Sequence, residues 1–144
     1  MAASSDSLHG MLMRLVQAAG MLQPEVVVPG HVASLSEIFA IHELDVDGPL
    51  AQRDLSERLR LDKSTVSRLV AGLVRKGYVE RERDPANRRL DRLRLTRAGR
   101  DVHRSMASAF HDRHTQVLEG MTEAERAALR TGLAGLLRAL TGGE

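Results

Sequence analysis

The sequence contains no cysteine in its 144 residues. It therefore has no disulfide, no thiolate metal site and no thiol redox switch, which fits a reducing cytoplasm. No run of 18 apolar residues is present, so we expect no membrane-spanning helix. Residues 1–10 lack the basic start and the apolar stretch of a signal peptide. Length and these absences together predict one cytoplasmic domain that can bury a real core.

The motifs of common enzyme classes are absent too. The sequence has no glycine-rich phosphate loop, no nucleophile elbow and no HExxH motif. Its carboxylates fall mostly on the surfaces of predicted helices or in a predicted hairpin. We therefore expect no enzymatic activity and no cofactor.

Acidic residues are scarce in the middle of the chain. Residues 51–100 contain 15 Lys and Arg against seven Asp and Glu, a net charge of +8. The remaining residues contain six basic and 12 acidic side chains, a net charge of −6. A positive segment between acidic ends is typical of a protein that contacts nucleic acid.

The positive segment contains an amphipathic helix between Asp62 and Gly77. One face is apolar at helical spacing, with Val66, Leu69, Val70, Leu73 and Val74. The opposite face is small or basic, with Ser64, Arg68, Ala71, Gly72 and Arg75. Because a glycine inside a helix costs roughly 0.5–1 kcal/mol relative to alanine, Gly72 indicates a close approach to something bulky. A helix with this face can enter the major groove of DNA.

A short helix is expected immediately before it, over residues 50–59, with Leu55 and Leu59 on one face. Residues 60–62 form a tight turn, and Asp62 is a good N-cap for the second helix. This order predicts a helix-turn-helix, whose second helix is the recognition helix. The alternative is an αα-hairpin in an ordinary helical core, and the concentration of basic residues argues against it.

Two segments of alternating polarity follow, residues 78–83 and 90–95, separated by a basic turn at 84–89. This pattern predicts a β-hairpin. A basic hairpin directly after a recognition helix is a wing, whose arginines reach phosphates or the minor groove. The alternative is a surface hairpin with solvated charges.

Helices are predicted on both sides of these elements. A first helix spans residues 5 to about 22 with Ser5 or Ser7 as its cap, residues 23–30 are a connector, and a second helix spans 32–44. A long helix follows the cap Thr96, from 97 to about 120, and a capping box of Thr122 and Glu125 opens the last helix. The inward residues expected in the second helix are Leu35, Ile38, Phe39, Ile41 and His42.

The last helix carries more leucine than one neighbouring helix would cover, at Leu129, Leu133, Leu136, Leu137 and Leu140. With the apolar first helix, this face predicts an intermolecular bundle and hence a homodimer. A dimer would place two recognition helices on half-sites one helical turn apart. The alternative is a monomer in which the first, long and last helices bury one another.

Four motifs together resemble the MarR family (multiple antibiotic resistance regulator) of bacterial transcription regulators: DKSTVSRLV, the glycine before YVER, the DPxxRR turn and LTxxGR. The resemblance covers nearly the whole chain. It implies a mainly α fold (α+β winged helix) in one domain, residues 1–144. Dimerisation helices would lie at 1–31 and 120–144, the winged helix-turn-helix at 32–100 with its wing at 78–95, and a long connecting helix at 97–119.

The family resemblance also implies a homodimer on a palindromic operator in double-stranded DNA, most often as a repressor, with a cleft for a small-molecule effector. Carried over to this sequence, it assigns groove contacts to the start of the recognition helix, backbone contacts to the start of the preceding helix and minor-groove contacts to the wing tip. The expected DNA-binding residues are Gln52, Arg53, Lys63, Ser64, Thr65, Ser67, Arg68, Arg75, Arg88 and Arg89. Asn87 departs from the family, which commonly has there an aspartate that braces the wing arginines.

The most specific predictions of DNA contacts concern three arginine side chains. Arg68 is the candidate for base readout through a bidentate contact to guanine, which is worth about 1–3 kcal/mol of discrimination. The alternative for Arg68 is a phosphate contact. For Arg88 and Arg89, shape readout of a narrow minor groove and plain phosphate neutralisation both remain open.

Six histidines raise the question of a metal. His111 and His114 are three residues apart on the long helix, and His42, His103 and Asp112 are the other donors considered. Solvated or core histidines and a pH-linked role are the alternatives. Phe39, His42, Met106 and Phe110 are candidates for an effector pocket, or else they belong to the core.

Together these patterns predict a DNA-binding transcription regulator whose DNA affinity is modulated by a small ligand. Two alternatives stay open: a zinc-responsive regulator of the same fold, and a winged-helix module that binds another protein. DNA affinity that falls steeply with salt would favour the regulator, because counterion release accompanies phosphate contacts.

Truncation after Glu119 tests the assignment of the last helix to dimerisation. The shortened chain lacks the leucine face, so we expect it to sediment as a monomer where the full chain sediments as a dimer. A truncated chain that remains a stable dimer in sedimentation velocity would contradict the assignment.

Overall fold

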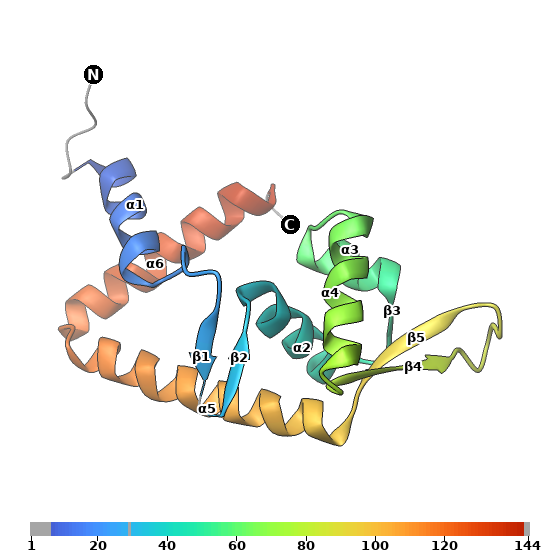
Figure 1. Ribbon diagram of the computed structural model, residues 1–144. Coiled ribbons are helices and arrows are strands. Elements are labelled where there is room, and N and C mark those ends of the chain that lie inside the picture. The colour runs from blue at the N-terminus through green and yellow to red at the C-terminus, as the bar shows by residue number, and fades with distance from the viewer. Residues whose placement is uncertain (1–6, 29, 143–144) are drawn as a thin grey trace. The chain divides into compact units, whose positions relative to one another are not determined.

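The computed structural model describes residues 7–28 and 30–142, which divide into two compact units, one ending at Met106 and one beginning at Ala107. The expected fold class is confirmed, because the chain is mainly helical with a small antiparallel sheet (Figure 1). The helices are α1 (Leu8–Ala18), α2 (Leu35–Asp47), α3 (Gln52–Leu59), α4 (Lys63–Arg75), α5 (Arg97–Glu119) and α6 (Glu123–Thr141). The strands are β1 (Val26–Val28), β2 (His31–Ala33), β3 (Leu50–Ala51), β4 (Val79–Arg83) and β5 (Asp91–Leu95). In the described ranges, no helix combines the length and the apolar character needed to cross a membrane.

The first part of the chain differs from the sequence prediction. Helix α1 begins after Ser7, whose hydroxyl accepts the Gly10 N–H at 3.1 Å, and it ends at Ala18 rather than near residue 22. Gly20 follows with a φ of +71°, the left-handed conformation that terminates helices. The segment predicted as a connector contains an antiparallel hairpin of β1 and β2. Its valines are β-branched, and such residues favour strands. Ser5, the other cap considered, lies outside the described residues.

Helix α2 begins three residues later than predicted and ends three residues later. Ser34 is its N-cap and forms a capping box with Glu37, which sets the start of the helix. The inward side of α2 is formed by Ile38, Ala40, Ile41 and Leu44.

Two of the residues predicted to point inward from α2 are in fact exposed. Phe39 is 51% exposed, and His42 is also exposed. Each follows a buried isoleucine by one position, and one residue turns a helix by about 100°. The buried face of α2 is therefore narrower than the sequence predicted.

The helix-turn-helix agrees with its prediction. Short strand β3 leads into α3, a three-residue turn follows, and α4 starts after its N-cap Asp62. Arg60 in the turn adopts the left-handed conformation, with φ at 53°. The Ser56 hydroxyl donates to the carbonyl of Leu61 at 2.6 Å and so closes the turn from inside. The completely buried side chains at the centre are Leu55, Val66, Val70 and Leu73.

The faces of α4 need two corrections. Val74, assigned to the apolar stripe, is 39% exposed. Gly72, assigned to the groove-facing side, is half-buried. A Cβ on Gly72 would lie 3.7 Å from the guanidinium of Arg75 and 3.9 Å from Glu37 Oε1 of α2. Gly72 therefore lies beside α2, and a methyl group would fit there in ordinary van der Waals contact.

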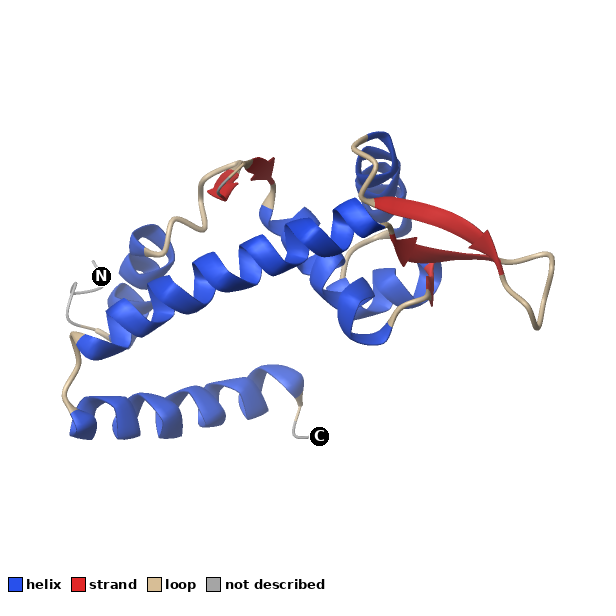
Figure 2. Ribbon diagram, turned by 90° about the horizontal axis from the view of Figure 1, so that it is seen from below, coloured by secondary structure: helices blue, strands red, loops and turns tan. Residues whose placement is uncertain are grey.

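The wing is part of a three-stranded antiparallel sheet in which β5 lies between β3 and β4. Strand β5 pairs along its whole length with β4, from Val79 opposite Leu95 to Arg83 opposite Asp91. It also pairs with β3, where Leu50 lies opposite Leu93. The β4–β5 ribbon projects beyond the helices of its unit and ends in a loop (Figure 2). That loop spans residues 84–90, one residue more than the turn predicted.

Helix α5 begins directly after the wing. Thr96 caps it, as predicted, by accepting the Gly99 N–H at 3.0 Å, and its hydroxyl donates to the carbonyl of Gly77 at 2.6 Å. Gly99 is buried, and a Cβ there would lie 2.1 Å from the carbonyl oxygen of Tyr78. The glycine of the LTxxGR motif thus allows α5 to start against the entrance to β4.

The second unit contains the end of α5 and the whole of α6. The predicted capping box is present: Thr122 and Glu125 each bond the backbone N–H of the other. The guanidinium of Arg126 donates to the carbonyls of Leu118 and Met121, at 2.9 Å each, and so ties α6 to the end of α5. No described residue of α6 is buried.

The two glycines give a matched stability prediction. Gly72→Ala should raise the free energy of unfolding by about 0.5–1 kcal/mol, because alanine is the better helix former and the site has room. Gly99→Ala should lower it by about 1–3 kcal/mol, because a backbone oxygen occupies the space of the new methyl group. Urea denaturation measures both. Equal effects of the two changes would contradict the packing described here.

Candidate nucleic-acid interface

The start of α4 is organised by the carboxylate of Asp62. Its Oδ1 accepts the Ser64 hydroxyl at 2.6 Å and the backbone N–H of Thr65 at 2.8 Å. Its Oδ2 accepts the Thr65 hydroxyl, also at 2.6 Å. These bonds lower the pKa of Asp62 below its ordinary value, with the Ser64 hydroxyl as the largest cause and the Thr65 hydroxyl next. Two of the predicted groove residues are therefore held by the cap of their own helix.

The other predicted DNA-binding residues of α4 lie on its outer face. Lys63, Ser67, Arg68 and Arg75 are all exposed. The Arg68 guanidinium lies 3.5 Å from the Thr65 hydroxyl oxygen, at the limit of a hydrogen bond. Opposite this face the helix is anchored by its buried stripe. Arg68 can consequently extend away from the protein without disturbing the core.

The start of α3 contributes a small recess next to α4. A cavity of about 180 Å³ is lined by Gln52, Arg53, Ser56, Lys63 and Val66. Arg53 is largely exposed and lies 3.7 Å from Glu57 and 3.8 Å from Asp54. Cationic and amide groups thus converge at the junction of the two helices.

Gln52 has a partner that the sequence did not reveal. Its side-chain oxygen accepts a hydrogen bond from the Arg81 guanidinium of β4 at 3.2 Å. This bond connects the first helix of the motif to the wing. It leaves the amide group of Gln52 available as a donor.

The wing tip is shaped by short-range hydrogen bonds. Asn87 Oδ1 accepts the backbone N–H of Arg89 at 3.2 Å, and Asp84 Oδ1 accepts that of Ala86 at 2.8 Å. The Arg83 guanidinium donates to the carbonyl of Arg88 at 2.8 Å. Asn87 therefore braces the loop by accepting a backbone hydrogen bond. The side chains of Arg88 and Arg89 have no ion pair in the described part of the chain.

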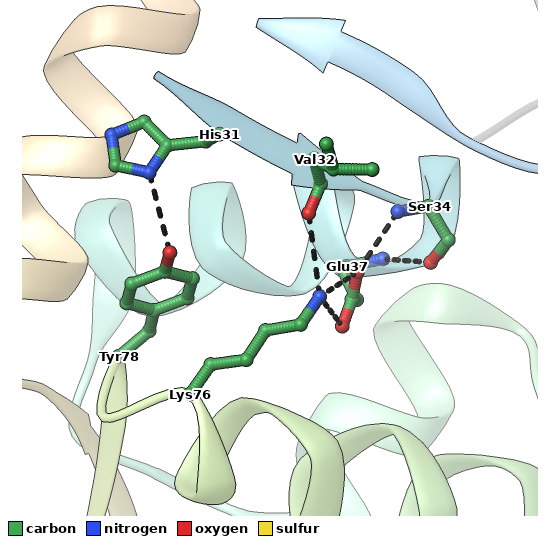
Figure 3. A network of polar contacts seen from close by, with 6 residues as sticks. All are labelled: His31, Val32, Ser34, Glu37, Lys76 and Tyr78. Carbon is green, nitrogen blue, oxygen red and sulfur yellow. Dashed lines mark hydrogen bonds and ion pairs between the residues drawn. The ribbon is translucent and has the colours of Figure 1, made fainter.

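A polar network fixes the other end of α4 (Figure 3). Lys76, its C-cap, donates to both carboxylate oxygens of Glu37 at 2.8 and 2.9 Å, and to the carbonyl of Val32 at 3.4 Å. Glu37 is only 12% exposed. Beside this group, His31 Nδ1 lies 3.2 Å from the Tyr78 hydroxyl oxygen. The network joins β2 and α2 to the end of α4 and the start of β4.

The proposed pocket residues have different surroundings. Phe39 and His42 are exposed on α2, whereas Met106 is buried in the core of the first unit. Phe110 belongs to the second unit, where its ring stacks on His114 with centroids 6.3 Å apart. Met106 is thus a core residue.

Two of the histidines, His42 and His103, lie together in the first unit. His42 Nδ1 lies 3.2 Å from His103 Nε2, and His103 Nδ1 lies 3.1 Å from Asp45 Oδ2. His111 and His114 are exposed on α5. Across the residues that the structure describes, no group of three or more His, Asp or Glu side chains is placed to hold a metal ion.

Sequence reasoning missed contacts between distant segments more than local ones. Glu37 and Lys76 are 39 residues apart, and no local pattern links them. The Asp62 cluster, in contrast, spans four consecutive residues. An acidic N-cap followed by hydroxyl residues two and three positions later is a visible signal for it.

Comparison with known proteins agrees with this geometry. Residues 34–90 match the model of the MarR family. Over nearly the whole chain, the structure is similar to the PcaV transcriptional regulator from Streptomyces coelicolor in complex with its natural ligand, with a TM-score of 0.73 and 26% identity, covering 97% of this chain and 99% of that one. Both comparisons indicate similarity to the MarR family, in sequence over residues 34–90 and in fold over nearly the whole chain.

Two further relatives extend the comparison. The HTH-type transcriptional regulator BilQ of Clostridium symbiosum is 33% identical over 81 residues, which are 56% of this chain and 56% of BilQ. The chain thus matches little more than half the length of that relative. The structure of Streptococcus pneumoniae FabT in complex with DNA is similar with a TM-score of 0.69 and 27% identity, covering 94% of this chain and 90% of FabT. BilQ and PcaV are both transcriptional regulators.

The Asp62 cluster predicts a pH dependence of stability. Because folding lowers the pKa of this carboxyl, its contribution is complete above the unfolded value of 3.8 and is lost as the pH falls below it. Asp62→Asn should therefore be less stable than the parent at pH 7, and the difference should shrink between about pH 5 and pH 3. Urea denaturation at several pH values measures this. The control is Asp112→Asn on exposed α5, and a difference for Asp62→Asn that does not change with pH would contradict the cluster.

Proposed function

We propose that this protein is a sequence-specific DNA-binding transcription regulator that binds a palindromic operator as a homodimer. We further propose that it represses transcription and that a small effector molecule modulates its DNA affinity. The observation that carries the proposal is the exposed face of α4 beside an arginine-tipped wing within one unit. Helix and ribbon are the elements that read major and minor grooves.

The distribution of ion pairs supports this proposal. Arg94 on the wing strand is neutralised by Glu80 at 2.5 Å and Glu82 at 3.2 Å. Arg68 and the two arginines of the wing tip have no ion pair in the described part of the chain. Cations without an acidic partner in the protein are the ones that phosphates and base edges can engage. FabT, which shares the fold, is known in complex with DNA.

The exposed apolar side chains of α6 support the homodimer. Leu129, Leu133, Leu136, Leu137 and Leu140 are all exposed. Isolated monomers rarely leave so many large apolar side chains of one helix in water. Two copies would present two recognition helices, which accounts for a palindromic site.

Effector binding rests on the relative with a bound molecule. PcaV has been crystallised with its natural ligand. Of the candidate pocket residues, Phe39 and His42 are exposed and so accessible to a ligand. No observation of this kind supports the second functional class, a winged helix that binds protein. The arginines without an ion pair, described above, suit phosphates instead.

The decisive experiment is selection of binding sites from a random duplex pool by the purified protein at near-physiological salt. We expect a palindrome with half-sites about 10 bp apart. Affinity for that duplex should fall steeply as salt rises. Salt-sensitive binding without any enriched sequence would overturn sequence-specific regulation and favour a protein-binding or architectural role.

Arg68→Ala should relax the base preference at one position of each half-site. Loss of one bidentate contact costs about 1–3 kcal/mol for the preferred base. The measurement is a repeat of the selection with the variant, with Arg130→Ala on α6 as the control. Uniform weakening across all sequences would instead make Arg68 a phosphate contact.

Arg89→Ala should weaken binding to every sequence and reduce the slope of log affinity against log salt by about one, because one phosphate-region charge is removed. Titrations of the selected duplex at several salt concentrations measure the slope. A slope equal to that of the parent would exclude Arg89 from the interface.

A further inference from the structure

We propose that Ser64 and Thr65 read DNA only as hydrogen-bond acceptors, and so select the exocyclic amino groups of adenine or cytosine in the major groove. Asp62 is the positioning residue that imposes this choice, because it takes the protons of both hydroxyls. The inference rests on the proposed function and deepens it. The helix-turn-helix and its charge assign DNA as the ligand, and the cap geometry decides which base edges are accepted.

The geometry leaves neither hydroxyl a free proton. Both oxygen–oxygen distances to Asp62 are 2.6 Å, within the 2.5–2.7 Å typical of a hydroxyl that donates to a carboxylate. A hydroxyl has one proton and two acceptor lone pairs. The backbone N–H of Thr65 fixes the same carboxylate, so the cluster is held at three points.

One contact within the protein shows on which side the Thr65 hydroxyl oxygen can accept a hydrogen bond. The Arg68 guanidinium approaches the Thr65 oxygen at 3.5 Å, and a guanidinium has no acceptor. The lone pairs of this oxygen are therefore directed toward the exposed side of α4.

The hydrogen-bonding groups that each base presents in the major groove then distinguish the bases. Adenine N6 and cytosine N4 donate, whereas guanine N7 and O6 and thymine O4 accept. Phosphate oxygens accept as well. An oxygen without a proton to give can pair with the amino groups and with none of the others. On the contacted strand, adenine is thus favoured over guanine, and cytosine over thymine.

Ser67 provides the internal contrast. It is exposed one turn along α4, and its hydroxyl has no hydrogen-bond partner among the described residues. It keeps its proton and can donate to phosphate or to a base acceptor. Arg68, beside it, is only a donor. In α4 the two hydroxyls of the first turn are therefore acceptors, whereas the side chains of Ser67 and Arg68 in the second turn can donate.

The test compares binding-site selections for the parent and four variants. Ser64→Ala and Thr65→Val locate the base pairs that face the hydroxyls, as the positions where preference is lost. Asp62→Asn keeps a good N-cap but replaces one acceptor by an amide donor, which releases a hydroxyl proton. Ser67→Ala is the control, since its hydroxyl does not touch Asp62. Circular dichroism confirms that each variant is folded.

The expected results are specific. At the positions located by the two hydroxyl variants, the parent selects adenine or cytosine, and Asp62→Asn gains guanine or thymine. Replacing the selected adenine by purine, or cytosine by 2-pyrimidinone, removes the amino group and should weaken binding of the parent by roughly two- to tenfold. The same replacement should have no effect on the variant that lacks the facing hydroxyl.

Three outcomes would overturn the proposal. Guanine or thymine selected by the parent at those positions would show that the hydroxyls donate. Uniform weakening by Ser64→Ala and Thr65→Val, without a change of preference, would make them backbone contacts. A parent that selects no sequence at all would remove the proposed function and this inference with it, so the two failures are distinguishable.

Discussion

Burial of one stripe of α4 is the constraint on which the proposed DNA-facing surface depends. Val66, Val70 and Leu73 are completely removed from solvent. Full burial of each such side chain contributes about 1.5–3 kcal/mol, so a rotation of α4 about its axis would lose several kcal/mol. This packing sets the rotation of α4, and the ion pair between Lys76 and Glu37 sets the position of its C-terminal end. The direction of every side chain on the outer face follows from these two anchors.

Much of the fold follows from local patterns in the sequence. The helix-turn-helix, the cap at Asp62 and the capping box at Thr122 are each encoded within a few residues, and the structure contains them. The hairpin of β1 and β2 was missed because three valines flanked by prolines resemble a connector. The exposure of Phe39 was missed because periodicity fixes which residues share a face, but not how wide the buried face is.

The candidate site was predictable in its position and less so in its chemistry. Helical spacing identified the exposed arginine of α4, and the wing pattern identified the arginines of the tip. It did not show that Gln52 is bonded to Arg81, or that Lys76 reaches Glu37, because such pairs join segments far apart in the chain. For Gly72, the sequence suggested proximity to DNA, whereas the structure places it beside α2. Tertiary neighbours, and not spacing, decide these assignments.

The central place of strand β5 has a consequence for the length of the DNA site. Because β5 pairs with β3 on one side and with β4 on the other, the wing is hydrogen-bonded to the segment that leads into α3. Recognition helix and wing tip are therefore carried by one framework, and neither can slide along the duplex without the other. In the proposed complex, the interval within a half-site between the bases that face the helix and the minor groove that faces the wing is consequently fixed. Insertion of a single base pair between them moves one of the two contacts by about 3.4 Å and out of register.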